Sequence, residues 1–293
     1  MSATVIDGNA IAAEIKVSVA ERVKALRARG IVPGLAALIV GDDAASISYV
    51  SSKAVDCAEV GIFSETFRLP ESASHAEVVG LIERLNADDR FHAILPQLPM
   101  PKQVDERAVI DTMLPRKDAD GLHPHSLGKL LRGELDGAIP CTPNGVVELL
   151  ARTGIDPAGK HVVVAGRSTL VGRPIAILLS NKAKGANATV TICHTGTPDL
   201  AVHTRQADIV VLAAGSVQML TAAMTKPGAV VIDVGVNRVD APSRPSGYRL
   251  VGDAAMDVRE VASYVTPYTG GVGPMTRAML LVNTVRAAEK FAG

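Results

Sequence analysis

The chain has 293 residues, 47% of them hydrophobic, and its 30 basic residues balance 30 acidic ones. This length and composition predict a globular protein that buries a sizeable core, arranged most simply as two domains. The balanced charge excludes a broad basic surface for nucleic acid or anionic membranes, so we expect a small-molecule partner, no nucleic acid and no membrane.

Cysteine usage and targeting signals indicate a cytoplasmic protein. Cys57, Cys141 and Cys193 have neither disulfide-framework nor zinc spacing, which suits a reducing compartment. The segment 1–16 contains acidic residues and lacks the apolar run of a signal peptide, and no apolar stretch reaches membrane-spanning length. We expect no bound metal.

The first half of the chain alternates helices and strands. Apolar residues at helical spacing predict a helix capped by Asn9 and ending at Gly30, followed by a buried strand at 35–40. The elements predicted next are a helix begun by the acidic pair Asp42 and Asp43 and ending near Gly61, a strand at 63–69, a helix opened by the capping box Ser74–Glu77 and a strand at 92–95. This order indicates a parallel sheet that binds ligands at the carboxyl ends of its strands.

A second alternating series follows a predicted helix at roughly 143–153. Its apolar strands are expected at 161–166, 188–194, 208–215 and 229–235, and the chain ends in an amphipathic helix over 275–291. The strand-then-glycine rhythm is typical of a nucleotide-binding sheet. The fold class is therefore predicted as α/β with two domains.

The loop GRSTLVGRP leaves the strand at 161–166 as a phosphate-binding turn would. Gly166 ends the strand, and Gly172 precedes a helix whose first turn contains Pro174. Such a turn aims free backbone N–H groups and the positive end of the helix at a phosphate. Because only two glycines of the usual G-x-G-x-x-G are present, a plain strand-to-helix turn is the alternative.

The end of the next strand favours NADP over NAD. It reads Cys193-His194-Thr195, with no carboxylate where NAD enzymes hold the ribose 2′-hydroxyl, whereas Arg167 and Thr195 would suit a 2′-phosphate. Gly215 and Gly235 follow later strands and would let backbone approach the nicotinamide and its ribose. Tight turns with a structural arginine remain the alternative.

The stretch YVSSK places Tyr49 and Lys53 one helical turn apart, so both can point into one site. Short-chain dehydrogenases use such a pair after their cofactor fold. Here the pair precedes the phosphate loop by more than a hundred residues, which argues against that class. A solvated helix face is the simpler alternative.

Further motifs carry polar groups or glycines. PQLPMP holds Gln97 at a strand exit, and KDADGLHPHS carries Asp118 and Asp120 but lacks the remaining ligands of a calcium loop. We therefore expect a carboxylate that accepts hydrogen bonds from a ligand. GGVGPMT, at 270–276, either approaches a flat ligand or links flexibly to the last helix.

Taken together, YVSSK, PQLPMP, KDADGLHP, CTPNGV, GRSTLVGRP, VIDVGVNR and GGVGPMT resemble, in order and spacing, the bifunctional methylenetetrahydrofolate dehydrogenase/cyclohydrolase family. The resemblance spans almost the whole chain. It implies a folate-binding catalytic domain of 1–140 and 275–293, an NADP-binding Rossmann domain of 141–274, a cleft between them, a last helix that returns to the first domain, and a homodimer formed through the cofactor domain.

The implied activity is oxidation of 5,10-methylenetetrahydrofolate with NADP and hydrolysis of the methenyl form to 10-formyltetrahydrofolate. Lys53 matches the catalytic lysine, Tyr49 the tyrosine that stacks on the pterin, Gln97 the partner of the lysine and Asp120 the carboxylate that holds the pterin. Hydrolysis near neutral pH requires that the pKa of Lys53 falls.

The expected site has two groups of residues. The expected cofactor contacts are Gly166, Arg167, Ser168, Gly172, Thr195, Gly215 and Val236. The expected folate contacts are Tyr49, Lys53, Gln97, Leu98, Asp120, Pro267, Gly270 and Gly271.

The chain departs from the family pattern at Pro96, where valine is usual, and at Tyr268-Thr269, where Val-Pro is usual. These changes leave open a modified folate, a specialised second copy of the enzyme, or a family-derived folate- or NADP-binding protein with reduced activity. A shikimate- or amino-acid-type dehydrogenase is a further alternative, against which the GGVGPMT and PQLP segments argue.

Overall fold

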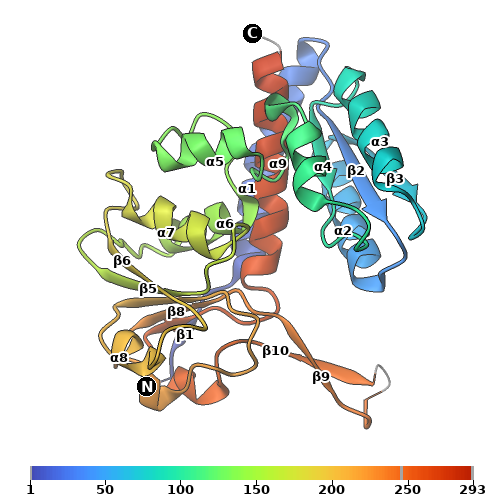
Figure 1. Ribbon diagram of the computed structural model, residues 1–293. Helices are drawn as coiled ribbons and strands as arrows, with labels where there is room; N and C mark the ends of the chain where they lie inside the picture. The colour runs from blue at the N-terminus through green and yellow to red at the C-terminus, as the bar shows by residue number, and fades with distance from the viewer. Residues whose placement is uncertain (1, 245–246, 292–293) are drawn as a thin grey trace. The chain divides into compact units, whose positions relative to one another are not determined.

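The computed structural model describes residues 2–244 and 247–291. The chain forms two compact units. Residues 13–141 and 277–293 make one, which we call the Lys53 unit, and residues 1–12 and 142–276 make the other, the Gly166 unit. The chain changes unit inside the helices α1 (Gly8–Ala28) and α9 (Val272–Phe291), and also after Cys141, the first residue of α6 (Cys141–Arg152) (Figure 1).

The Lys53 unit contains a three-stranded parallel sheet. β2 (Gly34–Val40) lies between β3 (Phe63–Leu69) and β4 (Ala93–Pro96). Every residue of β2 is buried, as expected of a central parallel strand covered on both faces. The predicted β-α-β-α-β order and the parallel pairing are confirmed.

The helices of the Lys53 unit begin and end at residues suited to those positions. α2 (Ala44–Val60) starts where the Asp43 carboxylate accepts a hydrogen bond from the Ser46 N–H, and it stops at Gly61, whose φ is 83°. The capping box of Ser74 and Glu77 opens α3 (His75–Ala87), as predicted. The remaining helices are α4 (Glu106–Thr112), the 3₁₀ turn η1 (Pro115–Lys117) and α5 (Pro124–Leu131).

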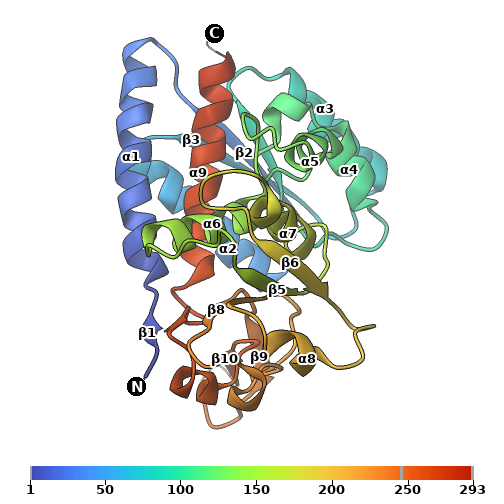
Figure 2. The same cartoon turned by 90° about the vertical axis from the view of Figure 1, so that its left-hand side faces the viewer.

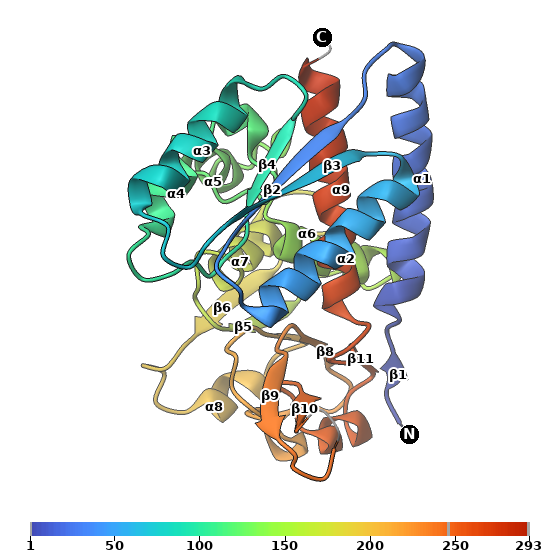
Figure 3. The same ribbon diagram turned by 90° about the vertical axis from the view of Figure 1, so that its right-hand side faces the viewer.

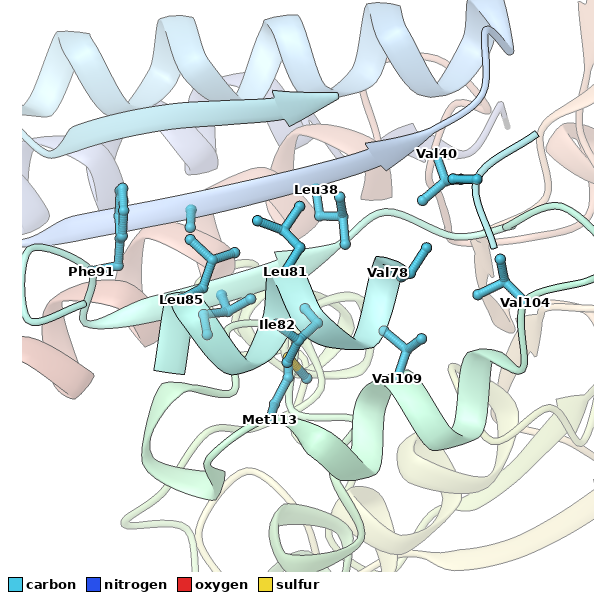
Figure 4. Close-up of a cluster of buried hydrophobic side chains, with 13 residues drawn as sticks. Leu38, Val40, Val78, Leu81, Ile82, Leu85, Phe91, Val104, Val109 and Met113 are labelled. Atoms are coloured by element: carbon cyan, nitrogen blue, oxygen red, sulfur yellow. The ribbon is translucent and has the colours of Figure 1, made fainter. Parts of the chain in front are cut away.

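The core of the Lys53 unit lies between its sheet and α3. Figure 4 shows Leu38 of β2 facing Leu81 of α3, with Val109 of α4 and Met113 packed on the far side of α3. Phe91 is fully buried at one end of this cluster.

The last helix packs into the Lys53 unit. Its Glu289 accepts a hydrogen bond of 2.7 Å from Arg22 of α1, and the two helices run side by side (Figures 2 and 3). The Asn283 side chain, which is 2% exposed, donates to the carbonyls of Ala119 (2.9 Å) and Ile139 (2.8 Å). These contacts hold α9 against the segment that carries Asp120.

The Gly166 unit contains a six-stranded parallel sheet. The strand order is β1 (Thr4–Val5), β11 (Tyr264–Val265), β8 (Val230–Asp233), β7 (Ile209–Leu212), β5 (His161–Ala165) and β6 (Thr189–Cys193). The chain passes from β5 to its neighbour β6 and then crosses to β7 on the other side of β5. The carboxyl ends of β5 and β7 therefore form the topological switch point at which such sheets bind ligands.

Helices and a hairpin complete the Gly166 unit. They are α6 (Cys141–Arg152), α7 (Gly172–Ser180), α8 (Leu200–Thr204), the 3₁₀ turns η2 (Ala222–Met224) and η3 (Met256–Glu260), and the antiparallel pair β9 (Asn237–Asp240) and β10 (Tyr248–Val251). The hairpin, which the sequence did not predict, projects away from the sheet (Figure 1).

The N-terminal segment departs from prediction. Residues 2–12 group with the Gly166 unit because Thr4 and Val5 form β1, an unpredicted strand that pairs with Tyr264 and Val265. A two-residue strand is too short to show alternation. The start of α1 was also wrong: Asp7, not Asn9, caps it, since its carboxylate accepts from the N–H groups of Asn9 (2.9 Å) and Ala10 (3.1 Å).

The last helix begins at Val272, three residues earlier than predicted, so part of the glycine-rich segment is helical. Among the residues that the structure describes, no helix is both long and apolar enough to cross a membrane.

Candidate active site

Tyr49, Lys53 and Gln97 meet in the Lys53 unit. The Lys53 side chain on α2 is buried, with the residue only 5% exposed, and its Nζ donates a hydrogen bond of 3.0 Å to Gln97 Oε1. The same Nζ lies 4.4 Å from the centroid of the Tyr49 ring. The helical spacing therefore brings half-buried Tyr49 and buried Lys53 together at one site, and Lys53 does not lie on a solvated helix face.

The backbone after β4 holds Gln97 in a fixed orientation. The Gln97 N–H donates to the Leu38 carbonyl (2.8 Å), and its Nε2 donates to the Leu98 carbonyl (2.7 Å), which leaves Oε1 toward Lys53. Pro96 pairs with Leu38 at the end of β4, an edge strand where a missing N–H is tolerated. Pro96 is therefore compatible with β4 and with the hydrogen bonds that Gln97 makes.

Burial dominates the electrostatics around Lys53. It lowers the pKa of Lys53, in the direction expected, and the nearby Asp120 carboxylate opposes this shift. Burial likewise raises the pKa of Asp120, opposed by the charge of Lys53. Both groups are shifted toward their neutral forms, so the amine is available as a base at a lower pH than that of a free lysine.

The cysteines beside Lys53 remain thiols. Burial raises the pKa of Cys57 to about 12, and burial together with the Asp120 charge raises the pKa of Cys141 well above its ordinary value. Neither thiol therefore competes with Lys53 for the role of base.

Asp118 shapes the loop that carries Asp120. Its buried carboxylate accepts hydrogen bonds from the N–H groups of Gly121 (2.9 Å) and His123 (2.9 Å) and from Ser126 Oγ (2.7 Å). This is the geometry of a carboxylate that organises a turn, and the sequence did not reveal it. Across 2–244 and 247–291, no group of three or more His, Cys, Asp or Glu side chains is arranged to hold a metal ion.

The turn between β5 and α7 is built on two glycines. Gly166 has a φ of 132°, and a Cβ there would lie 2.2 Å from the Ala213 carbonyl oxygen. A Cβ on Gly172, the first residue of α7, would lie 2.2 Å from the Gly166 oxygen. Ser168 Oγ accepts from the Val171 N–H at 3.1 Å. The turn is thus compact, with the N-terminus of a nine-residue helix behind it.

A cavity of about 430 Å³ lies beside this turn, at the carboxyl ends of β5, β6 and β7. It is lined by Ala165, Gly166, Arg167, Ser168, Cys193, His194, Thr195, Thr197, Leu200, Ala213, Ala214, Ser216 and Met219. No acidic side chain is among these described lining residues. We call this space the Gly166 cavity.

Four of the expected cofactor residues line the Gly166 cavity, and three do not. Gly166, Arg167, Ser168 and Thr195 line it. Gly172 is buried under the turn, Gly215 has a φ of 62° between two lining residues, and Val236 is 54% exposed beyond the end of β8.

The glycine-rich segment approaches the chain itself. A Cβ on Gly270 would lie 2.5 Å from Asn9 Nδ2, and a Cβ on Gly271 would lie 2.3 Å from the Pro267 oxygen. Packing within the Gly166 unit therefore accounts for these glycines. Tyr268 is half-buried, and a Cβ added to Gly252 would lie 3.2 Å from the Tyr268 Cβ.

Two buried carboxylates escaped sequence analysis. Asp253 is fully buried and Asp233 is 5% exposed. A Cβ on Gly235 would lie 2.1 Å from Asp253 Oδ1, so this glycine makes room for that carboxylate. The signal in the sequence is an acid within two residues of a glycine at a strand end, in IDVG and VGD.

Comparison with known proteins identifies the family. The model of the tetrahydrofolate dehydrogenase/cyclohydrolase catalytic domain matches residues 6–120, and that of the NAD(P)-binding domain of the same family matches residues 140–292. The chain belongs to the tetrahydrofolate dehydrogenase/cyclohydrolase family. This membership leaves the shikimate- or amino-acid-type alternative without support.

Two members of the family match over nearly their full length. A Chlorobium chlorochromatii protein named bifunctional protein FolD is 50% identical over 292 residues, covering 99% of each chain. The crystal structure of the bifunctional FolD enzyme from Campylobacter jejuni is 44% identical with a TM-score of 0.93, covering 99% of this chain and 100% of that one.

A third relative was solved with ligands. The Trypanosoma brucei methylenetetrahydrofolate dehydrogenase-cyclohydrolase, complexed with NADP cofactor and an inhibitor, is 41% identical with a TM-score of 0.94, covering 100% of this chain and 99% of that one. The region of this chain that matches the family's catalytic-domain model includes Tyr49, Lys53, Gln97 and Asp120. The region that matches the NAD(P)-binding model includes the Gly166 turn.

Proposed function

We propose that this chain oxidises 5,10-methylenetetrahydrofolate to the methenyl form with NADP, and hydrolyses the methenyl form to 10-formyltetrahydrofolate. The observation that carries the proposal is the buried Lys53 amine, 3.0 Å from Gln97 Oε1 and 4.4 Å from the centroid of the Tyr49 ring. An amine of lowered pKa is the group that the second reaction requires.

In the first reaction, the protein has to orient its substrate. Loss of hydride from the methylene carbon leaves a cation that the adjacent folate nitrogens stabilise, so no strong base is needed. The cofactor supplies the hydride acceptor. The Tyr49 ring would stack on the pterin, and the Asp120 carboxylate would accept its N–H hydrogen bonds, which together fix the reacting carbon.

In the second reaction, Lys53 would act on a water molecule. Water adds to the methenyl carbon, and a proton must leave that water before the ring opens. The free Lys53 amine takes this proton, and Gln97 Oε1 fixes the direction of the amine. Burial lowers the pKa of Lys53, so the free amine is available at a lower pH than that of a free lysine.

The residues of the Gly166 cavity fit NADP. Arg167 and Thr195 line it, and the absence of acids among its described lining residues suits a 2′-phosphate better than a bare 2′-hydroxyl. The N–H groups at the start of α7 would receive the pyrophosphate. Gly166, Ser168, Gly172, Gly215 and Val236 complete the proposed cofactor set.

The remaining proposed features follow from the family resemblance. Leu98, Pro267, Gly270 and Gly271 are proposed folate contacts. A homodimer formed through the Gly166 unit is supported by β6, which is an end strand of the described sheet and exposes 41% of Ile192. We propose that the protein acts in the cytoplasm.

The test is a pair of assays on the purified chain. With 5,10-methylenetetrahydrofolate present, we expect reduction of NADP to exceed reduction of NAD at equal concentration, and no reduction without the folate. Hydrolysis of methenyltetrahydrofolate should proceed without any nicotinamide. Binding of NADP with neither turnover would refute the proposal and favour a family-derived binding protein.

A further inference from the structure

The Asp253 carboxylate collects the backbone N–H groups of one loop. Ala214, Gly215 and Ser216 each donate to it at 2.9 Å, and Asn237 Nδ2 donates at the same distance. Asp253 is fully buried. Each of its two oxygens accepts two of these hydrogen bonds, so the carboxylate is satisfied by amide groups alone.

The loop that Asp253 holds forms a wall of the Gly166 cavity. Ala214 and Ser216 line that cavity, directly after β7 at the switch point of the sheet. Residues 214–216 are exposed on their outer side, whereas their N–H groups face inward to Asp253. The carboxylate therefore lies behind the wall and touches no space that a ligand would enter.

Fixing these N–H groups also fixes the carbonyls of the same peptides. In a trans peptide the C=O points opposite to the following N–H, so the carbonyls of residues 213–215 are directed away from Asp253. The Ala213 carbonyl is the atom that lies against Gly166, where a Cβ would meet it at 2.2 Å. One carboxylate thus sets the orientation of carbonyl acceptors beside the phosphate turn.

The surrounding glycines show that the arrangement is built around this carboxylate. A Cβ on Gly235 would lie 2.1 Å from Asp253 Oδ1, and a Cβ on Gly252 would lie 2.0 Å from Asp233 Oδ2. The Asp233 carboxylate in turn accepts from the Asp253 N–H (3.1 Å) and the Ala254 N–H (2.9 Å). The segment 251–254 is therefore fixed through its backbone N–H groups by Asp233 and through the Asp253 side chain by loop 214–216.

We propose that Asp253 is a positioning residue for the cofactor, because it presents loop 214–216 as the wall against which a dinucleotide binds in the Gly166 cavity. The proposal rests on the proposed use of NADP and deepens it. A purely structural role would lower stability without changing cofactor affinity in the folded protein.

Asp253→Asn tests the proposal with almost no change in shape. Since both oxygens accept N–H groups, the new NH₂ faces two donors whichever way the amide turns. In the folded variant we expect the dissociation constant of NADP, measured by titration calorimetry, and its KM to rise at least about 10-fold. Hydrolysis of the methenyl form, which uses no cofactor, should stay within about two-fold of the wild type.

Asp208→Asn is the matched control. Asp208 also lies in the Gly166 unit and accepts from the His161 N–H (2.9 Å) and Lys226 Nζ (2.7 Å), but it precedes β7 and lies outside the Gly166 cavity. We expect this variant to lose stability and to bind NADP as the wild type does. Asn237→Ala removes one of the four donors and should weaken NADP binding in the same direction but less.

The outcomes separate the two proposals. A wild-type chain that does not bind NADP would overturn the proposed cofactor and this inference together. A wild type that binds NADP, with Asp253→Asn binding it equally well, would overturn the positioning role alone, as would an equal loss in Asp208→Asn. If Asp253→Asn does not fold, Asn237→Ala with unchanged NADP affinity would overturn it.

Discussion

In the Lys53 unit the proposed chemistry depends on side chains, whereas in the Gly166 unit it depends on backbone. Lys53 is buried against Gln97 and Tyr49, and its protonation state is set by that burial. The Gly166 turn offers N–H groups and carbonyls whose directions are set by glycines and by a buried carboxylate, Asp253.

The difference teaches where each site is sensitive to change. A site made of titratable side chains is sensitive to the identity of one atom and to pH, because each unit of pKa is worth about 1.4 kcal/mol between protonation states. A site made of backbone is sensitive to added volume and to the groups behind it. The comparison would fail if substitutions showed that the Lys53 site responds mainly to volume, or that the Gly166 site responds mainly to the identity of one titratable atom.

Lys53→Met is expected to have the largest effect. It keeps the length of the side chain and removes the amine, so hydrolysis of the methenyl form should fall by about 10² to 10⁴ at every pH, the usual contribution of a general base. NADP binding in the other unit should not change. The assays are turnover of methenyltetrahydrofolate and titration calorimetry with NADP.

Lys117→Met is the control for that experiment. Lys117 is also buried, at 1% exposure, and burial also lowers its pKa, but its Nζ donates to the carbonyls of Leu85 (3.0 Å) and Asp88 (2.8 Å). We expect its loss to lower stability and to leave hydrolysis per folded molecule intact. Equal loss of hydrolysis in both variants would contradict the role of Lys53.

Gly166→Ala should break the backbone site. The new Cβ would meet the Ala213 oxygen at 2.2 Å, in a backbone conformation with φ of 132° that L residues rarely adopt. The turn has to move, and we expect NADP affinity to fall at least about 100-fold while methenyl hydrolysis persists.

Gly159→Ala provides the comparison for Gly166→Ala. Gly159 also has a positive φ, 71°, but its Cβ would meet nothing within 4 Å. This variant should cost about 1 kcal/mol of stability and leave NADP affinity unchanged. If both variants bind NADP equally, the close approach at Gly166 has no part in cofactor binding.

Much of the fold could be predicted because local signals agreed with the tertiary structure. Asp43 and Gly61 bound α2, and Ser74 with Glu77 opens α3, where the sequence indicated. β1 and the β9–β10 hairpin could not be predicted. A strand of two residues shows no period, and β1 forms only because distant Tyr264 and Val265 offer it an edge.

The candidate site, like the fold, could be predicted where local spacing reveals it and not where tertiary packing decides it. Tyr49 and Lys53 share a helix face that spacing reveals, whereas their contact with Gln97 depends on the packing of α2 near the end of β4. Asp253 could not be recognised, since its partners are backbone N–H groups 37 to 39 residues away. Every residue except proline has a backbone N–H group, so the partners of Asp253 cannot be recognised from residue types. Only the glycines that make room for the carboxylate hint at it in the sequence.

Asp233 makes the stability of the Gly166 unit depend on pH. Burial, with a smaller contribution from the Asp253 charge, raises the pKa of Asp233 from 3.8 to about 6. Since the folded state binds this proton more tightly than the unfolded state, the stabilisation is fully present below about pH 4 and is lost as the pH rises through about 6. The difference amounts to about 3 kcal/mol.

Urea unfolding of the Gly166 unit from pH 4 to 8, followed by circular dichroism, measures this slope. Asp233→Asn should flatten it, whatever the variant does to stability at any one pH. Asp136→Asn is the control, since Lys129 and Lys290 lower the pKa of exposed Asp136 to about 2, outside this range. An unchanged slope in Asp233→Asn would mean that Asp233 is ionised throughout.

Gln97→Glu should have the smallest effect and sharpens the comparison most. It places a carboxylate 3.0 Å from Lys53 Nζ and stabilises the ammonium, so the pKa of Lys53 rises. Hydrolysis of the methenyl form needs the free amine, so its rise with pH should move to higher pH. We expect about a 10-fold loss near neutral pH that is recovered in alkaline buffer.

Gln103→Glu introduces the same charge elsewhere in the Lys53 unit. Gln103 Nε2 donates to the carbonyls of Glu71 and Ala73 and makes no contact with Lys53. Its pH profile should match that of the wild type. A Gln97→Glu profile lowered equally at every pH would mean that Gln97 only shapes the pocket, and the Lys53 unit would then depend on geometry as the Gly166 unit does.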